Sequence, residues 1–209
     1  MSETAVSVLE QPAQASMSVW TDKEQFNQML RVADMLSKAS LVPQSYQGKP
    51  QDCFLALEIA GRMNVSPFTV MQNMYVVKGK PAWAGQACMM LISSCGKFKD
   101  AKPVYTGTRG KDDRGCYIQA TRVSDGEVVQ GTEVTLRMAA AEGWTSNTKW
   151  RSMPEQMLAY RAASFFARVH CPEALFGAQT VEEVEDVAGR KSTAQRIQEA
   201  IKAEGTEKK

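Results

Sequence analysis

The sequence is short of the residues from which metal centres and hydrolytic active sites are most often built. It has a single histidine, His170, and its five cysteines form no C-x-x-C pair, so no zinc site is expected. It also lacks a P-loop, a G-x-S-x-G nucleophile elbow and an H-E-x-x-H motif. These absences disfavour ATP-driven strand exchange and predict a protein that is not an enzyme and uses no cofactor and no metal.

Long apolar runs and targeting segments are also absent. No stretch of about eighteen apolar residues, the length needed to cross a bilayer, occurs in the 209 residues. The first twenty residues lack the basic start and apolar stretch of a secretory signal. We therefore expect a cytoplasmic protein with no membrane association, in which the cysteines stay reduced and fill small core positions.

Charge is distributed unevenly along the chain. Residues 49–172 carry sixteen Lys or Arg and ten Asp or Glu, a net charge of +6, whereas residues 1–48 and 173–209 each carry −2. A basic middle between acidic ends favours a body that binds a polyanion and tails that do not touch it.

Hydrophobic periodicity predicts a mixed α+β fold. Apolar spacing of three and four predicts a helix over 21–40, opened by the capping pattern Thr21-x-x-Glu24, and further helices at about 50–63, 67–72, 86–94, 135–142 and 154–170. Alternation predicts a hairpin at 74–83 and strands at 98–106, 115–123 and 127–134. We expect an antiparallel β-sheet, made of the hairpin plus a three-stranded meander, packed against the long helix 154–170.

The chain ends are expected to stand apart from one core. Residues 1–20 show no period and predict a disordered leader, and residues 21–187 are expected to form the core. The capping pattern Thr180-x-x-Glu183 predicts that a further helix begins there. Residues 188–209 are expected to form a short polar helix and tail. Residues 143–152 are expected to form a polar loop.

The helix 154–170 carries the strongest candidate for phosphate binding. Residues seven apart on a helix share a face, so Arg161 and Arg168 are expected to point the same way, about 10 Å apart along the axis. Leu158, Ala162, Phe165, Phe166 and Val169 are expected to face the core. Two guanidinium groups at this spacing suit two phosphates of a bound strand. The alternative is that they form ion pairs with carboxylates such as Glu155.

Two further basic groups are candidates. Lys149-Trp150-Arg151 sets an aromatic ring between two cations, as in a platform that stacks bases and clamps phosphates, although Trp150 could instead pack against the helix. Lys78 and Lys80 flank the glycine of the hairpin turn and can contact a passing backbone. The basic residues between 97 and 122 include a 107–115 loop that we interpret as solvated.

A metal-dependent nuclease is a weaker alternative. Asp112, Asp113, Asp125 and Glu127 could in principle hold Mg²⁺, but they occupy turn positions, where acidic residues are common.

The string Trp150-x-x-x-Pro154-x-x-Met157-Leu158-x-x-Arg161-Ala162, with Arg168, Pro172, Gly177 and Thr180-x-Glu182-Glu183, resembles the RecT/Bet (Redβ-like) phage single-strand annealing recombinases. The segment from Asn73 to Pro81 extends the similarity, which covers about residues 41–187. The resemblance implies a core that binds single-stranded DNA, holds the annealed duplex and forms rings or helical filaments without ATP. By position, the resemblance puts Lys149, Arg151, Arg161 and Arg168 on or beside basic positions of the family's groove, and Lys78 near the DNA-facing lysine of its hairpin. Asp186 with its acidic neighbours is expected outside the groove.

The resemblance also implies partners. The C-terminal region of relatives docks other proteins, so residues 188–209 are candidates for contact with a phage exonuclease or a host single-strand-binding protein. A passive single-stranded DNA-binding or replication-accessory module, which holds DNA without promoting pairing, remains the alternative function.

Overall fold

A computed structural model describes residues 19–188, which form two compact units that divide after Gln72. The expected leader, apart from its last two residues, and almost all of the expected tail at 188–209 lie outside the described residues. Within 19–188, no helix combines the length and the apolar character that crossing a bilayer requires.

The first unit consists of helices. α2 (Lys23–Ser37) and α3 (Pro50–Met63) were both predicted, and α4 (Pro67–Asn73) ends where the second unit begins. The predicted cap of α2 was one residue off, because Asp22 and not Thr21 accepts the N–H groups of Glu24 and Gln25, at 2.8 and 3.1 Å. Rings from α2 and α3 pack together, with the centroids of Phe26 and Phe54 5.3 Å apart.

A small sheet opens the second unit. The predicted hairpin is confirmed as β1 (Met74–Val77) and β2 (Lys80–Trp83), paired antiparallel. Lys78 and Gly79 form its turn, both with positive φ (52° and 75°), as a two-residue hairpin turn requires. A third strand that the sequence did not reveal, β7 (Gln179–Thr180), pairs parallel to β2. It brings the last described helix against the hairpin.

The larger sheet is the predicted meander. β3 (Phe98–Thr106), β4 (Gly115–Arg122) and β5 (Val128–Gln130) lie in that order, and β6 (Val134–Thr135) also pairs with β4. One strand had been predicted over 127–134. It is interrupted at residues 131–133, between β5 and β6. Gly131 packs so closely against α8 that a Cβ there would come within 2.8 Å of the Phe166 ring.

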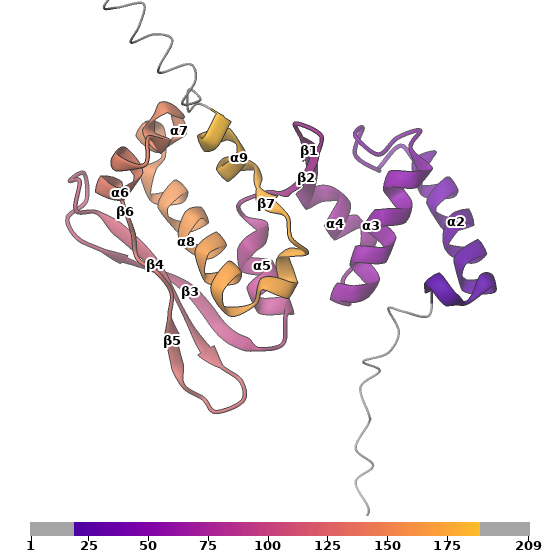
Figure 1. Cartoon of the computed structure of the whole chain (residues 1–209), viewed down its shortest axis with the longest axis horizontal. Helices are drawn as coiled ribbons and strands as arrows, with labels where there is room; N and C mark the ends of the chain where they lie inside the picture. Colours follow the sequence, from indigo (N-terminus) through magenta and orange to yellow (C-terminus); the bar gives the residue numbers. More distant parts are fainter. Residues whose placement is uncertain (1–18, 189–209) are drawn as a thin grey trace, which may run out of the picture. The chain divides into compact units, whose positions relative to one another are not determined.

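The long helix α8 (Pro154–His170) lies between the larger sheet and α5 (Ala87–Ser94), as Figure 1 shows. Ile118 and its β4 neighbours two residues away in each direction are buried on the face that α8 covers. On α8, Leu158, Ala162 and Phe166 are buried as predicted, but Val169 is 66% exposed. The fold class, α+β with antiparallel strands and a long helix, is confirmed. The prediction that the hairpin and the meander form one sheet was wrong, because they belong to two separate sheets.

Short helices complete the second unit. They are α6 (Leu136–Ala141), η1 (Trp144–Ser146), α7 (Lys149–Ser152), η2 (Pro172–Leu175) and α9 (Val181–Ala188). The prediction of a polar loop at 143–152 was wrong, since η1 and α7 are helical and bury both of their tryptophans. Figure 1 places α7, α9 and the β1–β2 hairpin along one edge of this unit, and α9 contacts β1, β2 and η1.

Candidate nucleic-acid interface

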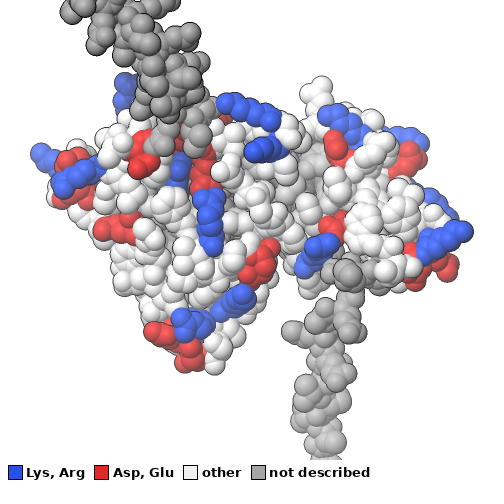
Figure 2. Space-filling view, in the orientation of Figure 1, with Lys and Arg blue, Asp and Glu red and all other residues white. Residues whose placement is uncertain are grey.

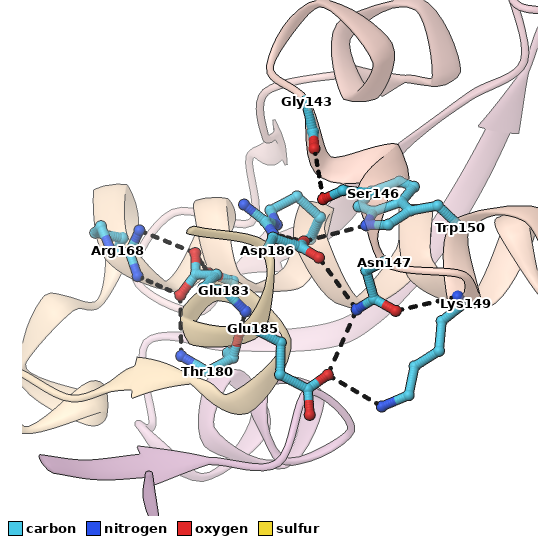
Figure 3. A network of polar contacts seen from close by, with 12 residues as sticks. Gly143, Ser146, Asn147, Lys149, Trp150, Arg168, Thr180, Glu183, Glu185 and Asp186 are labelled. Carbon is cyan, nitrogen blue, oxygen red and sulfur yellow. Dashed lines mark hydrogen bonds and ion pairs between the residues drawn. The ribbon is translucent and has the colours of Figure 1, made fainter. Parts of the chain in front are cut away.

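The face of α8 that carries Arg161 and Arg168 is directed at α9. Figure 3 shows Arg168 paired with Glu183 of α9. Arg161, only 6% exposed, pairs with Asp186, whose side chain is fully buried. Arg168 is 44% exposed and pairs through both terminal nitrogens with Glu183, at 3.1 and 2.8 Å. The two arginines do point the same way, but toward carboxylates of the chain itself.

The Arg161–Asp186 pair is enclosed by aromatic and amide groups. The guanidinium carbon of Arg161 lies 3.9 Å from the centre of the Trp144 ring. Asp186 accepts hydrogen bonds from Trp150 Nε1 at 3.1 Å and Asn147 Nδ2 at 3.2 Å. Burial raises the pKa of Asp186, and the bonds from Trp150 and Arg161 offset part of that rise. The pair belongs to the interior of the unit.

Two predicted DNA contacts therefore need correction. Trp150 is 2% exposed and its indole N–H is already bonded to Asp186, so the ring is not an open stacking platform. Arg161 is buried and paired, so its charge does not reach a phosphate. Asp186 was expected outside the groove, yet it is the residue that holds both side chains in place.

Glu183 ties the start of α9 to α8. The predicted capping box is confirmed, because Thr180 N–H donates to Glu183 Oε2 at 2.9 Å and Glu183 N–H donates to Thr180 Oγ1 at 3.2 Å. The Ser164 hydroxyl adds a bond of 2.5 Å to Glu183 Oε1. Burial disfavours the charged form of Glu183, but Arg168, Ser164 and Thr180 outweigh it and hold its pKa below its usual range.

Basic and acidic side chains are interspersed over much of the face of the second unit in Figure 2. Residues 73–188 carry fourteen Lys or Arg and thirteen Asp or Glu. Most of the arginines there are paired, since Arg109, Arg114, Arg122, Arg137, Arg161 and Arg168 each contact a carboxylate. The positive charge that a polyanion can use is therefore limited to a smaller set of side chains.

Six cations of the second unit are exposed and lie beyond ion-pair distance of any carboxylate in the described part of the chain. They are Lys78, Lys80, Lys99, Lys102, Lys111 and Arg151. Three of them, Lys78, Lys80 and Arg151, were predicted site residues. A fourth predicted residue, Lys149, pairs with Glu185 at 3.3 Å, with both side chains nearly half exposed. Such a pair contributes about 0–1 kcal/mol, so Lys149 can exchange Glu185 for a phosphate.

The four cations of the hairpin turn and α7 lie on either side of α9. Lys78 and Lys80 project from the turn between β1 and β2, and Lys149 and Arg151 come from α7. α9 contacts both hairpin strands and also η1, against which α7 packs. We call Lys78, Lys80, Lys149 and Arg151 the edge cations.

Lys99 and Lys102 on β3 were not among the DNA contacts predicted from the sequence. Lys99 pairs in register with Thr121, and Lys102 with Gln119. Since Ile118 and Ala120 face α8, Gln119 and Thr121 face away from it, and the two lysines share that outer face. The alternation of β4 was the signal that could have placed them there.

The acidic turn residues do not form a metal site. No group of three or more potential ligands occurs in the part of the chain that the structure describes. Asp112 pairs with Arg137, whereas Asp125 and Glu127 pair with Arg122. The two groups lie at opposite ends of β4, about 25 Å apart for a strand of this length. These four acidic residues therefore do not support a metal-dependent nuclease.

Comparison with known proteins gives one match. No curated protein and no solved structure matches the chain. A family model described as the RecT family matches residues 27–195, well over half of the chain, and includes α8, α9 and the hairpin. The chain therefore belongs to the RecT family.

Proposed function

We propose that this protein binds single-stranded DNA and anneals complementary strands without ATP, as a homo-oligomeric ring or helical filament, in phage or prophage recombination. Membership of the RecT family supports this function. The observation that carries it is the set of edge cations, which are exposed and which no carboxylate holds firmly.

The edge cations suit contact with a DNA backbone. Phosphate contacts fix the position of a strand without reading its sequence, and they leave the base edges free to pair. A surface that holds one strand in this way presents its bases to a complementary strand. The duplex product keeps the same phosphate contacts, so the oligomer can retain it.

The predicted site residues take two roles in this proposal. Lys78, Lys80, Lys149 and Arg151 contact phosphates. Trp150 and Arg161 act indirectly, because with Asp186 they hold α7 and α9 in position. Arg168 has an exposed side, but its charge is neutralised by Glu183, so we assign it a minor share of DNA affinity.

The remaining partners follow from the family resemblance. We propose that residues 21–187 contain all that DNA binding, annealing and oligomerisation require. Residues 188–209 are the proposed contact for a phage exonuclease or a host single-strand-binding protein, and most of them lie outside the described residues.

Salt dependence of DNA binding tests the interface. Four phosphate contacts on a single strand give a slope of log K against log salt of about −3, and each contact adds about −0.7. The double variants Lys78→Ala/Lys80→Ala and Lys149→Ala/Arg151→Ala should each weaken binding and flatten the slope by about 1.4. Arg137→Ala removes an exposed cation of α6 that is not one of the edge cations, and serves as the control.

The same variants separate annealing from passive binding. If the protein binds single strands with this salt slope but does not accelerate their pairing, it is the passive DNA-binding module. If neither double variant changes affinity or slope, the edge cations are not the interface.

A further inference from the structure

A cavity of about 280 Å³ opens between the base of the hairpin and the start of α9. Its lining includes Tyr75 of β1, Gly85 and Gln86 before α5, Tyr160 of α8 and Glu182 of α9. Two tyrosine rings, an amide and a carboxylate thus meet in one small space. The volume is just under the range of about 300–1,000 Å³ that is usual for ligand pockets, so it suits a single planar ring system.

Glu182 is the anomaly of this cavity. Its Oε2 atom is buried and is the one buried side-chain polar atom among the described residues that has no hydrogen-bond partner. The other three acids of α9 are all bonded, Glu183 to Arg168, Glu185 to Lys149 and Asp186 to Arg161. A buried acceptor without a donor is destabilising, and more so when it is charged. Burial raises the pKa of the Glu182 carboxyl, and hydrogen bonds from the backbone of Glu182 and Gly85 offset only part of that rise.

Gly85 allows this arrangement. A Cβ at this position would lie 2.7 Å from Glu182 Oε2 and 2.7 Å from Tyr160 Cδ2, closer than such atoms approach. Only glycine lets the carboxylate and the ring come so near the backbone. The backbone at Gly85 thus forms a closely packed wall of the cavity next to Glu182 Oε2, the atom without a hydrogen-bond partner.

The surroundings indicate what supplies the missing donor. Lys78 and Lys80 lie at the tip of the hairpin whose β1 strand contributes Tyr75, and the positive charge of Lys149 acts on Glu182, against that of Glu185. Cations flank the cavity and one carboxylate lies inside it. A basic side chain would meet the edge cations on its way in, whereas a nucleotide would bring its phosphate to them and its base to the cavity.

We propose that this cavity receives one base of the bound strand, whose exocyclic amino group donates to Glu182 Oε2. A carboxylate that accepts from an amino group is the standard contact of an acidic side chain with cytosine N4, and the tyrosine rings offer faces for stacking. Each protomer would hold one base in this way while the other bases keep their pairing edges exposed. The proposal rests on the proposed DNA binding and adds a base preference to it.

Cytosine and uracil make the sharpest probe, because they have the same size and differ in the group at C4. Cytosine offers an amino donor there, whereas uracil offers a carbonyl oxygen that Glu182 would repel. Fluorescence anisotropy should show oligo-dC binding about tenfold more tightly than oligo-dU of equal length at one salt concentration, since a good polar contact discriminates by about 1.4 kcal/mol or more.

Variants of the cavity residues test whether the preference for cytosine arises there. Glu182→Ala should bring the dC and dU affinities together. Gly85→Ala should do the same, because its Cβ would displace the Glu182 carboxylate and the Tyr160 ring from their positions in the cavity wall. Glu185→Gln removes a charge from the same helix but not from the cavity, and should keep the tenfold ratio. Circular dichroism of each variant checks that it is folded.

Three results would overturn the inference. Equal dC and dU affinity in the wild type would show that the cavity does not select a base. A preference for dC that persists in Glu182→Ala would show that Glu182 does not contact the base. Loss of oligomers on Glu182→Ala without any base preference assigns the cavity to a basic side chain of a second copy. Binding of neither oligonucleotide is different, because it refutes the proposed DNA binding itself.

Discussion

The buried Arg161–Asp186 pair gives the most exacting prediction about stability. Asp186→Ala removes the acceptor of three donors, Arg161, Trp150 Nε1 and Asn147 Nδ2. It leaves a guanidinium group that is 6% exposed without its counter-ion. Removal of one partner from a buried ion pair costs about 3–5 kcal/mol, a large part of the 5–15 kcal/mol by which a domain is usually stable.

Urea unfolding measures this loss, and Trp144 and Trp150 report it through their fluorescence because both pack beside Arg161. Asp186→Ala should lower the free energy of unfolding by about 3–5 kcal/mol. A loss below about 1 kcal/mol would refute the reasoning, since that is the size expected of an exposed pair.

A double variant tests whether Arg161 stabilises the fold or contacts DNA. Arg161→Met/Asp186→Leu replaces both charges by apolar groups of similar size, and such replacements are often neutral or stabilising. We expect the double variant to recover most of the lost stability and to bind single-stranded DNA with wild-type affinity. A folded double variant with much weaker DNA binding would restore Arg161 as a phosphate contact.

Three other predictions address separate features. The pKa of Glu183 is lowered in the folded state, so its stabilisation is present above the unfolded value of about 4.5 and is lost as pH falls through the lower folded value. The stability gap between wild type and Glu183→Gln should therefore shrink in thermal unfolding below about pH 4.5, and a constant gap would contradict this. Phe166→Ala should cost about 3–5 kcal/mol in urea unfolding, because the ring is fully buried between Gly131 and Phe98; a cost below 1 kcal/mol would be inconsistent with that packing. Lys99→Ala/Lys102→Ala tests the outer sheet face, and we expect a smaller loss of DNA affinity than for Lys78→Ala/Lys80→Ala, with the reverse order arguing for the sheet.

Local patterns in the sequence predicted most of the helices and strands. The hairpin was visible in its Lys78-Gly79 turn, and α8 in Pro154 and the apolar spacing that follows. β7 was not visible, because a two-residue strand has no period and its partner β2 lies about a hundred residues earlier in the chain.

The candidate site was harder to predict for a related reason. Spacing along α8 correctly put Arg161 and Arg168 on one face, but it does not say whether that face meets water or another helix. The acids at Glu183 and Asp186, three residues apart on α9, form a matching face that pairs with them. That complementarity was the available signal, and only tertiary contact shows that it is used.

Annealing without ATP can be measured directly. Two complementary oligonucleotides, each with one dye of an energy-transfer pair, can be mixed with the full chain and no nucleotide, and the rate of duplex formation recorded. We expect pairing faster than without protein, and slower pairing with Lys78→Ala/Lys80→Ala than with the Arg137→Ala control. Pairing no faster than in protein-free solution would contradict it.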